Sequence, residues 1–586
     1  MSKRPIRIAN FSGFFGDRVA ALRDQLEGGE IDVLSGDYLA ELTMLILAKT
    51  RTRRADGGYA RTFVEALSPV LGEVLDRRVK VVVNAGGLDP RGAAVAIRQL
   101  ASDQGLTPRV AAISGDDLMG RLGELQSGGE EFVNLQTGER LSDSEDGFIT
   151  ANAYMGGWGI TQALAAGADI IVTGRVADAS VVSGPAAWWH GWERHDYDRL
   201  AGAVAAGHVI ECGMQATGGN YSFFTEIEDL AYPAFPWAEI AADGSSVIGK
   251  HDGTGGRVSI GTVVSQLLYE IGPPAYLTPD VVARFDTVRL EEIAPDRVGL
   301  SGTRGEAPPT TLKVAASVVG GYRNSMMIGL TGLNQAEKAA LVSQQVWRAM
   351  PWKQEEYDEV DESIIGQGSS DPKTNAEATS FWRIAVKSTD PEKVGRAFSD
   401  SAISVLLGSI PGMFSASPPA PASQFARYWP TTVDRTAITQ EIDLDGTIIE
   451  VRETTPEPGP PVAPLSTQIP SLPIGETRTV PLGELVGARS GDKGGTGNIG
   501  VFARKAEAYA WIADVLTVER LRSLMPDLAH LNVERYLLPN LWSLNFVIHG
   551  LLGEGVSSSL RIDAQAKGLA EYLRACRIEV PTSLLD

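Results

Sequence analysis

The sequence predicts an α/β protein in which a core domain, built on a mostly parallel sheet and carrying a β-rich insertion, is followed by a smaller α+β domain. Apolar runs typical of buried strands, such as residues 79–84 and 169–173, alternate with segments of helical spacing such as 38–49. Apolar strands separated by helices indicate a parallel sheet covered on both faces. Between residues 214 and 324 the composition shifts to Gly, Thr, Val, Pro and aromatic residues, which favours added strands and long loops.

The elements of the core domain follow one another as βα units. The expected order is strand 6–11, helix 17–26, strand 31–34, helix 38–49, helix 59–75, strand 79–84, helix 90–101, strand 109–113, helix 159–166, strand 169–173 and helix 200–212. Ligands of open α/β sheets bind in the crevice outside the carboxyl ends of the strands. We therefore expect the catalytic crevice at that edge, beside the β-rich insertion.

A proline-rich segment marks the clearest domain boundary. Residues 456–473 contain seven prolines among eighteen residues, a composition typical of an extended spacer. Beyond it, short strands and helices make a compact α+β module. The predicted organisation is a core domain at 1–452, a linker at 453–476 and a C-terminal domain at 477–586.

Charge and composition narrow the class of protein. The 586 residues carry a formal net charge of −21, which does not offer the basic face that nucleic acid or an anionic membrane would need. The apolar run at 42–48 is far shorter than the roughly 20 residues of a membrane span, and the N-terminus lacks the pattern of a signal peptide. Cys212 and Cys576 are the only cysteines, as is typical of a reducing compartment. We expect a cytoplasmic protein without a nucleic-acid or membrane partner.

Five glycine-rich polar loops interrupt the apolar pattern and predict a small-molecule site. Glycine lets a ligand approach the backbone closely, so such loops at strand ends commonly bind anions. The loops are residues 84–92, 174–178, 218–221, 250–256 and 489–500. Their polar and glycine positions supply candidate substrate-binding residues, which are Asn84, Gly86, Gly87, Arg91, Arg175, Asp178, Asn220, Lys250, Thr254, Arg489, Asp492 and Lys493.

The loop at 84–92 allows two interpretations. N–H groups at the start of the following helix, together with Arg91, favour an anion there. A structural turn capped by Asp89 explains most of the same residues, although it does not require the room that the pair Gly86 and Gly87 opens. Both interpretations stay open from the sequence.

No complete nucleotide-binding fingerprint is present. Residues 10–16 contain the second and third glycines of a Rossmann turn but have Phe11 in place of the first. Asp37 lies about 20 residues downstream, where an acid would bind ribose, and the GxxxxGK[ST] motif is missing. We interpret Gly13, Gly16 and Asp37 first as turn residues, keep Asp37 as a candidate for substrate binding, and expect no dinucleotide cofactor.

A helix end at residues 207–213 is the densest candidate for catalysis. In a helix, His208, Glu211 and Cys212 fall at i, i+3 and i+4 and share one face, which permits an acid–base pair or a nucleophile with a nearby base. The alternative is an ordinary helix C-terminus with a buried cysteine. No second cluster offers further ligands at metal-binding spacing, so no metal site is predicted.

Two further segments are candidates for ligand binding. Lys250 and His251 place a cation and a potential acid–base group in a glycine-rich turn, a mixture that suits phosphate or carboxylate, although a hairpin turn explains the glycines equally well. Residues 489–500 are too polar for a simple connector and predict a second ligand loop or a contact with the core domain. The tryptophan-rich segment 188–192 is more typical of core or subunit interface, and it favours a homo-oligomer.

Several of these motifs, taken in order, resemble the acyclic terpene utilisation protein family, AtuA. The resemblance lies in residues 35–44, 84–87, 174–178, 208–212 with 217–220, and 250–251 with 253–256, and it covers about the first 450 residues. The tail at 489–494 is similar to the ferredoxin-like module that follows the main domain in many members. This resemblance implies a bacterial catabolic protein that takes part in the degradation of citronellol, geraniol and related branched acids.

The function expected from these observations is an enzyme acting on a branched or unsaturated acyl-CoA, as a hydratase, lyase or isomerase. Such chemistry needs only acid–base residues, so we expect no cofactor. CoA enters as part of the thioester substrate. His208, Glu211, Cys212 and His251 are the candidate catalytic residues. The alternatives are a noncatalytic accessory subunit of an acyl-CoA carboxylase and an ATP-dependent ligase or kinase, which would lack a P-loop.

Overall fold

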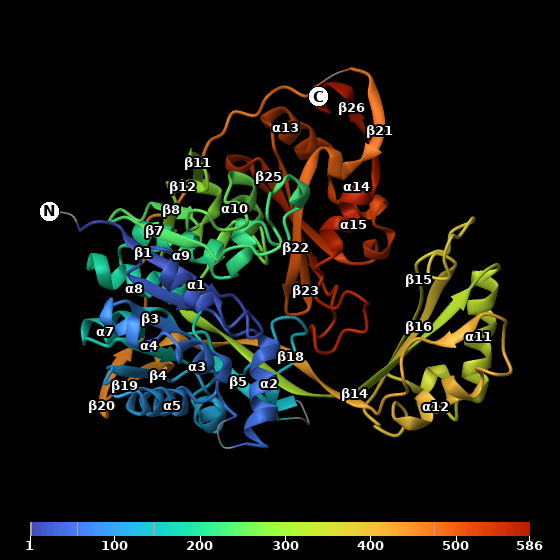
Figure 1. Cartoon of the computed structure of the whole chain (residues 1–586), viewed down its shortest axis with the longest axis horizontal. Helices are drawn as coiled ribbons and strands as arrows, with labels where there is room; N and C mark the ends of the chain where they lie inside the picture. Colours follow the sequence, from blue (N-terminus) through green and yellow to red (C-terminus); the bar gives the residue numbers. More distant parts are fainter. Residues whose placement is uncertain (1–2, 55–56, 144–146, 474, 586) are drawn as a thin grey trace. The chain divides into compact units, whose positions relative to one another are not determined.

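The computed structural model describes residues 3–54, 57–143, 147–473 and 475–585. It divides into two compact units (Figure 1). Unit 1 comprises Met1–Ser317, Trp429–Leu551 and Gln565–Asp586, and unit 2 comprises Val318–Tyr428 and Leu552–Ala564. No helix in the part of the chain that is described is long and apolar enough to cross a membrane.

Unit 1 is built on a mixed sheet. Its centre is parallel, in the order β1 (Ile6–Ser12), β2 (Val33–Gly36), β3 (Lys80–Val83), β6 (Ile170–Thr173) and β4 (Val110–Ser114). Antiparallel strands extend both edges, with β7 (Trp237–Ile240), β8 (Ser246–Gly249), β12 (Arg297–Ser301) and β11 (Arg289–Ala294) beside β1, and β19 (Thr439–Leu444) and β20 (Thr447–Arg452) beside β4. A mostly parallel sheet is therefore not confirmed, because the β-rich insertion joins the edge of this sheet instead of forming a layer of its own.

Helices cover both faces of this sheet. One face packs against α1 (Ala21–Gly28), α3 (Arg61–Leu67), α4 (Leu71–Asp76) and α5 (Pro90–Asp103). The other carries α7 (Trp158–Ala165), α8 (Ser180–His190) and α9 (Tyr197–Ile210). Further elements of the first part of the chain are α2 (Glu41–Arg51), α6 (Leu122–Ser127), β5 (Phe148–Ala153), α10 (Ile260–Leu267) and the small sheet of β9 (Ala275–Leu277), β10 (Val282–Arg284) and β13 (Arg304–Glu306).

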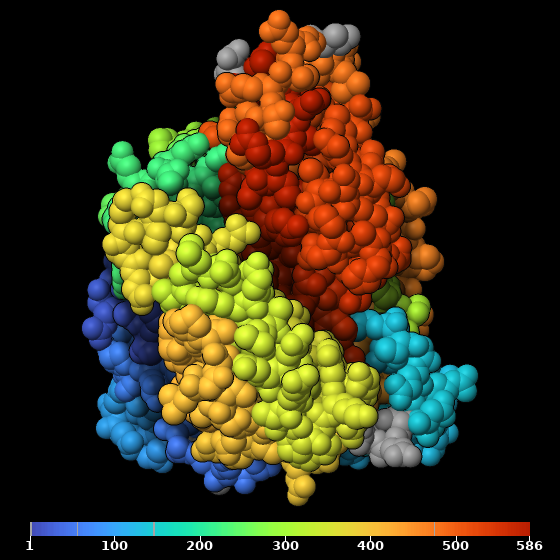
Figure 2. Space-filling view, turned by 90° about the vertical axis from the view of Figure 1, so that its right-hand side faces the viewer, coloured from blue at the N-terminus to red at the C-terminus, as the bar shows by residue number. Residues whose placement is uncertain are grey.

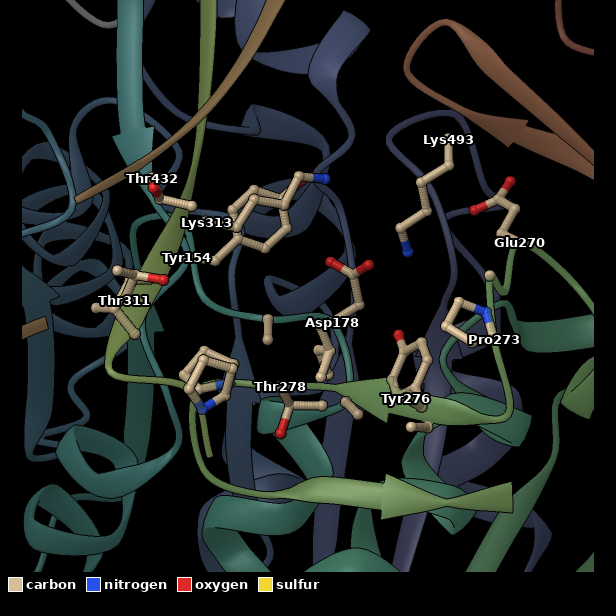
Figure 3. A pocket seen from close by; sticks show the side chains of 18 of the residues that line it. Tyr154, Asp178, Glu270, Pro273, Tyr276, Thr278, Thr311, Lys313, Thr432 and Lys493 are labelled. Carbon is tan, nitrogen blue, oxygen red and sulfur yellow. The ribbon is translucent and has the colours of Figure 1, made fainter. Parts of the chain in front are cut away.

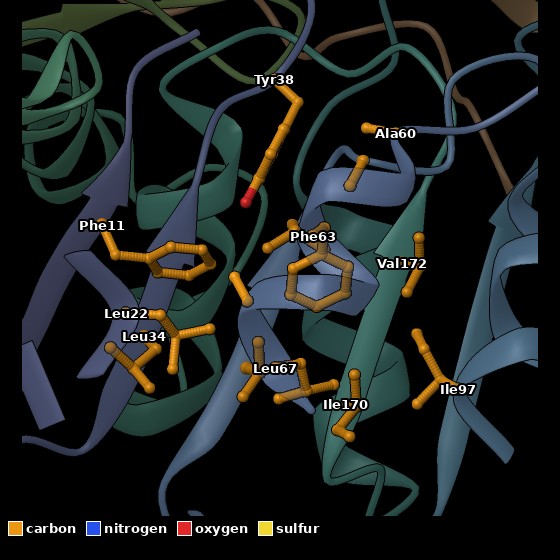
Figure 4. Close-up of a cluster of buried hydrophobic side chains, with 14 of the residues drawn as sticks. Phe11, Leu22, Leu34, Tyr38, Ala60, Phe63, Leu67, Ile97, Ile170 and Val172 are labelled. Atoms are coloured by element: carbon orange, nitrogen blue, oxygen red, sulfur yellow. The ribbon is translucent and has the colours of Figure 1, made fainter. Parts of the chain in front are cut away.

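The core on the α5 face buries every second residue of the central strands, such as Val81 and Val83, and the residue between them, Val82, is buried on the opposite face. Figure 4 shows the rings of Phe11 and Phe63 among aliphatic side chains from the central strands and from α1, α3 and α5. The two rings stack with centroids 6.2 Å apart, and both side chains are almost completely buried. Burying one such ring contributes roughly 1.5–3 kcal/mol. This core holds the parallel strands in place, so that their carboxyl ends form one rigid edge.

The C-terminal domain is a four-stranded antiparallel sheet with helices. Its strand order is β22 (Val486–Lys493), β23 (Thr496–Ala503), β25 (Ser543–His549) and β24 (Asn532–Leu538). The helices are α13 (Ala506–Val515), α14 (Val518–Leu524) and α15 (Leu569–Ala575), and β21 (Thr477–Pro481) pairs with β26 (Arg577–Pro581). The segment expected to be a polar loop at 489–500 thus forms a β hairpin, which packs on α10.

Unit 2 is an antiparallel sheet with two helices on its apolar side. The chain enters it along β14 (Thr311–Thr331) and leaves along β18 (Ser423–Asp434). The sheet also contains β15 (Glu359–Ile365), β16 (Thr379–Ser388) and β17 (Met413–Ser415), and β5 pairs with β14 as well. Helices α11 (Gln335–Ala349) and α12 (Arg396–Ser404) bury Val342, Val346 and Phe398 against it. Figure 2 views this unit from the side on which α11 (lime) meets solvent.

Candidate functional site

Polar side chains follow the central strands where each of them ends. Asp37 comes directly after β2 and Asn84 directly after β3, and the Asn84 side-chain N–H group donates to Asp37 Oδ1. Asn84 Oδ1 in turn accepts from the backbone N–H of Tyr38 at 2.7 Å. Because the carboxyl ends of parallel strands meet at one edge, residues distant in sequence become neighbours here.

Arg175, two residues after β6, is a buried cation at the same edge. Its side chain is 3% exposed, donates to Asp178 Oδ1 and to the carbonyl of Val176 at 2.8 Å, and lies 4.0 Å from the ring centre of Tyr154. Although burial opposes the charged form, the Asp178 carboxylate raises the pKa of the Arg175 guanidinium. A buried charge requires such compensation.

Two acids near Arg175 keep their protons more firmly than usual. Burial, together with the Asp178 carboxylate, raises the pKa of Asp37 and of Glu211 well above their ordinary values. Both side chains also feel the charge of Arg175, which places the four groups in one cluster. The raised pKa of Glu211 favours its protonated form, which is the form that can donate a proton.

Helix α9 brings His208 and Glu211 together as its periodicity predicts. His208 Nδ1 lies 3.2 Å from Glu211 Oε1, and both side chains are buried. The imidazole packs 4.8 Å from the ring of Tyr276, and burial lowers the pKa of His208 to about 4. Burial therefore favours the uncharged form of both partners. Burial and then the Glu211 carboxyl raise the pKa of the Cys212 thiol, so a thiolate is disfavoured there.

A cavity of about 420 Å³ opens beside this cluster. Its walls are mainly apolar, from Leu135, Tyr154, Ala177, Ala179, Pro273, Ala275, Tyr276, Leu277, Pro279, Pro309 and Leu312. Two cations, Lys313 and Lys493, and two carboxylates, Asp178 and Glu270, also line it. Figure 3 shows the carboxylate of Asp178, the amino group of Lys493 and the hydroxyl of Tyr276 directed into the same space.

The C-terminal domain contributes directly to this cavity. Lys493 ends β22, and its amino group lies 5.6 Å from the ring centre of Tyr276. Lys567 Nζ contacts Glu270 at 2.9 Å and Asp492 at 3.1 Å, which fixes the position of the Glu270 carboxylate. Burial is the main cause that raises the pKa of Asp492, to about 6. Arg489 lies on the ring of Tyr269, 4.1 Å from its centre.

The structure thus gathers many of the predicted residues at one place. Asp178 and Lys493 line the cavity. Behind them, or beside the loop that carries Glu270, lie Asp37, Asn84, Arg175, His208, Glu211, Cys212, Arg489 and Asp492. None of this second group is among the cavity's lining residues. His208, Glu211 and Cys212 therefore cannot touch a ligand in the cavity, and they can influence it only through a lining residue such as Asp178 or Tyr276.

The Lys250–Gly256 segment lies elsewhere. Lys250 Nζ donates to the carbonyl of Thr254 at 2.7 Å and pairs with Asp296 at 3.2 Å. The His251 imidazole packs on the end of α1, where a Cβ added at Gly28 would lie 2.4 Å from the ring. These contacts account for the adjacent Lys and His within the fold, and none of the segment lines the cavity.

The glycine pair after β3 serves close packing. A Cβ at Gly86 would lie 2.5 Å from the carbonyl oxygen of Thr173, and Gly87 has a φ of +52°. The Asp89 side chain accepts from the backbone N–H of Gly92 at 2.8 Å, which caps α5. Of the remaining predicted residues, Arg91 pairs with Glu441 at 3.0 Å on the surface, and Asn220 is exposed in a turn.

The turn after β1 is likewise filled by the protein itself. Asp17 accepts from the backbone N–H groups of Gly13 at 2.6 Å and of Phe14 at 3.2 Å, which are the donors that a phosphate would need. A Cβ at Gly13 would lie 2.5 Å from the carbonyl carbon of Cys212. The interpretation of Gly13 as a turn residue agrees with these contacts.

Tyr154, Glu270, Tyr276 and Lys313 are lining residues of the cavity that the sequence analysis did not single out. Lys313 had a local signal, because it is a single cation in the apolar run that begins β14. The other three stand in ordinary surroundings and become neighbours only through folding. In the described part of the chain, no group of three or more His, Cys, Asp or Glu side chains is placed to hold a metal ion.

Comparison with protein families identifies both parts of the chain. The model of the acyclic terpene utilisation family protein AtuA matches residues 6–444, and the model of the AtuA ferredoxin-like domain matches residues 480–579. No curated protein and no solved structure matches the chain. Because the first match covers well over half of the sequence, the chain belongs to the acyclic terpene utilisation family AtuA and carries that family's C-terminal ferredoxin-like domain.

Proposed function

We propose that the chain is an enzyme of acyclic terpene or branched-acid breakdown that performs acid–base chemistry on a branched or unsaturated acyl-CoA, as a hydratase, lyase or isomerase. Membership in the AtuA family supports the pathway. The chemistry rests on one observation, which is the apolar cavity into which Asp178 and Lys493 point together.

The cavity suits a branched hydrocarbon chain. Its volume of about 420 Å³ lies in the range of small-molecule sites, and its aliphatic and aromatic walls would bury apolar surface at roughly 25 cal/mol per Å². Aliphatic walls also exclude water, which strengthens the electrostatic contacts of the few polar groups present. Those groups are therefore the ones that orient the substrate.

Asp178 and Lys493 have complementary roles in the proposed reaction. Asp178, held on one side by Arg175, takes the proton from the carbon next to the thioester carbonyl. Negative charge then develops on the carbonyl oxygen, and the ammonium of Lys493 stabilises it. Lys493 is suited to this role because, among the described residues, it forms no ion pair with a carboxylate that would neutralise it.

Tyr276 and Glu211 are the candidate donors near the cavity. Burial raises the pKa of the Tyr276 hydroxyl, so this group stays protonated and can donate a hydrogen bond at the cavity wall. Glu211 lies behind that wall with its own proton. Hydration and double-bond migration need a proton donor as well as a base, and Glu211 would act through Tyr276 or Asp178 because it does not line the cavity itself.

Exchange of the α-proton with deuterated water tests this proposal. We expect the full-length chain to exchange the α-hydrogen of a branched acyl-CoA, and Asp178→Asn to lower the rate at least 100-fold, as is usual for loss of a general base. Asp252→Asn is the matched control, because Asp252 is 91% exposed and lies outside the cavity. The rate is measured by mass spectrometry of the thioester.

A second variant tests the role proposed for Lys493 in the exchange reaction. Lys493→Met should also lower the exchange rate, while Lys373→Met, at an exposed position, should not. Equal rates in Asp178→Asn and the unmodified chain would contradict the proposal. That result would favour the accessory-subunit hypothesis, which is then examined by co-purification with an acyl-CoA carboxylase.

A further inference from the structure

A second cavity, of about 330 Å³, opens at the N-terminal end of α10. The first part of the chain and the C-terminal domain both line it, with Tyr221, Glu226, Ile227, Arg257, Ser259, Ile260, Gly261, Val264, Leu290, Glu292, Phe502, Ala503, Arg504, Asn540, Leu541 and Trp542. It shares no lining residue with the cavity that contains Asp178. In Figure 1, α10 lies between the β7–β8 edge and the C-terminal domain.

The hydroxyl of Tyr221 lies at the second cavity without a hydrogen-bond partner among the residues that the structure describes. The residue is 9% exposed. A Cβ added at Gly261 would lie 2.2 Å from the hydroxyl oxygen, so the oxygen sits directly on the first turn of α10. The oxygen is not among the fully buried polar atoms that lack a partner, so it is accessible at the cavity wall and would hydrogen-bond to a ligand there.

The first turn of α10 adds backbone donors. Ser259 caps the helix by accepting from the Thr262 N–H group at 3.3 Å, and the Thr262 side chain accepts from the Ser259 N–H group at 3.0 Å. Ile260 and Gly261 line the cavity, and their N–H groups precede the first intrahelical hydrogen bond. Such donors, together with the helix dipole, favour an anion.

Charged groups of both signs surround the Tyr221 hydroxyl. The guanidinium groups of Arg257, Arg504 and Arg574 and the carboxylate of Glu226 act on it, and Glu292 also lines the cavity. Arg504 is held by Glu226 through two contacts of 2.7 and 3.1 Å, and Arg574 is held by Glu571 at 2.7 Å. Arg257 forms no ion pair within the described part of the chain, so its charge is available to a ligand.

Aromatic and aliphatic side chains also line the cavity. Trp542 lines it and is 39% exposed, an unusual exposure for a side chain of that size. Val264 and Leu541 line the cavity as well and are apolar. An exposed indole face beside aliphatic side chains offers a surface on which a planar ring can stack.

We propose that this cavity binds a phosphate monoester carried on a planar ring, the chemistry of a nucleotide, with the phosphate at the first turn of α10 beside Arg257 and the ring on Trp542. Two kinds of ligand carry both groups: CoA, at its nucleotide end, and a free adenine nucleotide. The site is independent of the reaction proposed for the first cavity, because its ligand needs no acyl group.

Calorimetric titration of the full-length chain tests this site. Adenosine 3′,5′-bisphosphate, CoA, AMP and inorganic phosphate are the four probes. We expect binding of a nucleotide probe that Arg257→Gln weakens about tenfold or more, because a charge-assisted contact is lost. Arg289→Gln is the matched control, since Arg289 is exposed on β11 and does not line the cavity. Tyr221→Phe, which preserves packing, should weaken the same probe several-fold.

The outcomes separate these two kinds of ligand. If CoA and the bisphosphate bind and Arg257→Gln weakens both, the ligand is the nucleotide end of CoA; if AMP alone binds, it is a free nucleotide. The proposal is overturned if no nucleotide binds at millimolar concentration, if inorganic phosphate binds as tightly as the nucleotides, or if Arg257→Gln and Arg289→Gln behave alike. A negative exchange assay with a branched acyl-CoA leaves this result unaffected, because the bisphosphate carries no acyl group.

Discussion

At the scale of single residues, burial decides the chemistry of the site more than residue type does. His208 and Glu211 would form an ion pair on a protein surface, yet burial lowers the pKa of the first to about 4 and raises that of the second well above its usual 4.5. The sequence identifies the pair through its i, i+3 spacing but contains no measure of its desolvation. This is why it predicts the neighbours and not their protonation states.

Glu211→Gln should make stability less dependent on pH. The folded-state pKa of Glu211 is raised, so its contribution to the free energy of unfolding is fully present below about pH 4.5 and is lost as pH rises toward the folded-state pKa. Glutamine does not titrate and avoids this loss. We expect the melting temperature of the variant to exceed that of the unmodified chain by a margin that grows from pH 5 to pH 8.

The control for this comparison is Glu27→Gln, at a position that is 61% exposed on α1. Its melting temperature should follow the unmodified chain across the same pH range. A margin for Glu211→Gln that shrinks with rising pH would show that Glu211 is ionised in the folded protein, and its role as a proton donor would then be lost.

At the scale of elements, glycine-rich segments have two functions that the sequence does not distinguish. Glycine permits both the approach of a ligand and the approach of a neighbouring element. Residues 489–500 illustrate the second function, because a Cβ at Gly491 would lie 2.6 Å from the ring of Tyr269 and one at Gly500 would lie 2.5 Å from Leu268 Cβ. The polar pattern left open a ligand loop or a contact with the core domain. The structure shows the contact, whose partner, the end of α10, is more than 200 residues away.

Gly500→Ala should therefore destabilise the chain. The added methyl group would force β23 away from Leu268, and overpacking of this kind typically costs about 1–3 kcal/mol. Gly120→Ala is the matched control, since a Cβ there meets nothing within 4 Å. Denaturant titration measures both free energies of unfolding, and equal values for the two variants would argue against tight packing of the hairpin on α10.

At the scale of the whole molecule, the sequence predicts local units better than their assembly. The five central strands follow the expected βα order, because each strand and helix shows its own periodicity. The antiparallel edges depend on which strand a distant segment joins, and β19 reaches β4 from more than 300 residues away. Unit 2 escaped the sequence analysis because its strands and helices were absorbed into the core domain.

The same non-local contacts predict that the C-terminal domain stays bound when the linker is cut. Asn545 donates to the carbonyls of Ile271 at 3.0 Å and of Gly272 at 2.8 Å, and Asn498 donates to Leu268 at 2.8 Å. These hydrogen bonds join the domain to the loop that lines the first cavity, and both belong to unit 1. A covalent connection is therefore not needed to hold them together.

A protease site inserted between residues 470 and 473, where the linker is exposed, allows a direct test. After complete cleavage we expect the two fragments to elute together in gel filtration and to retain acyl-CoA exchange. A matching insertion that is left uncut controls for the added residues. Separate elution of the fragments would show that these contacts are too weak to hold the C-terminal domain, and Lys493 would then reach the cavity only through the intact linker.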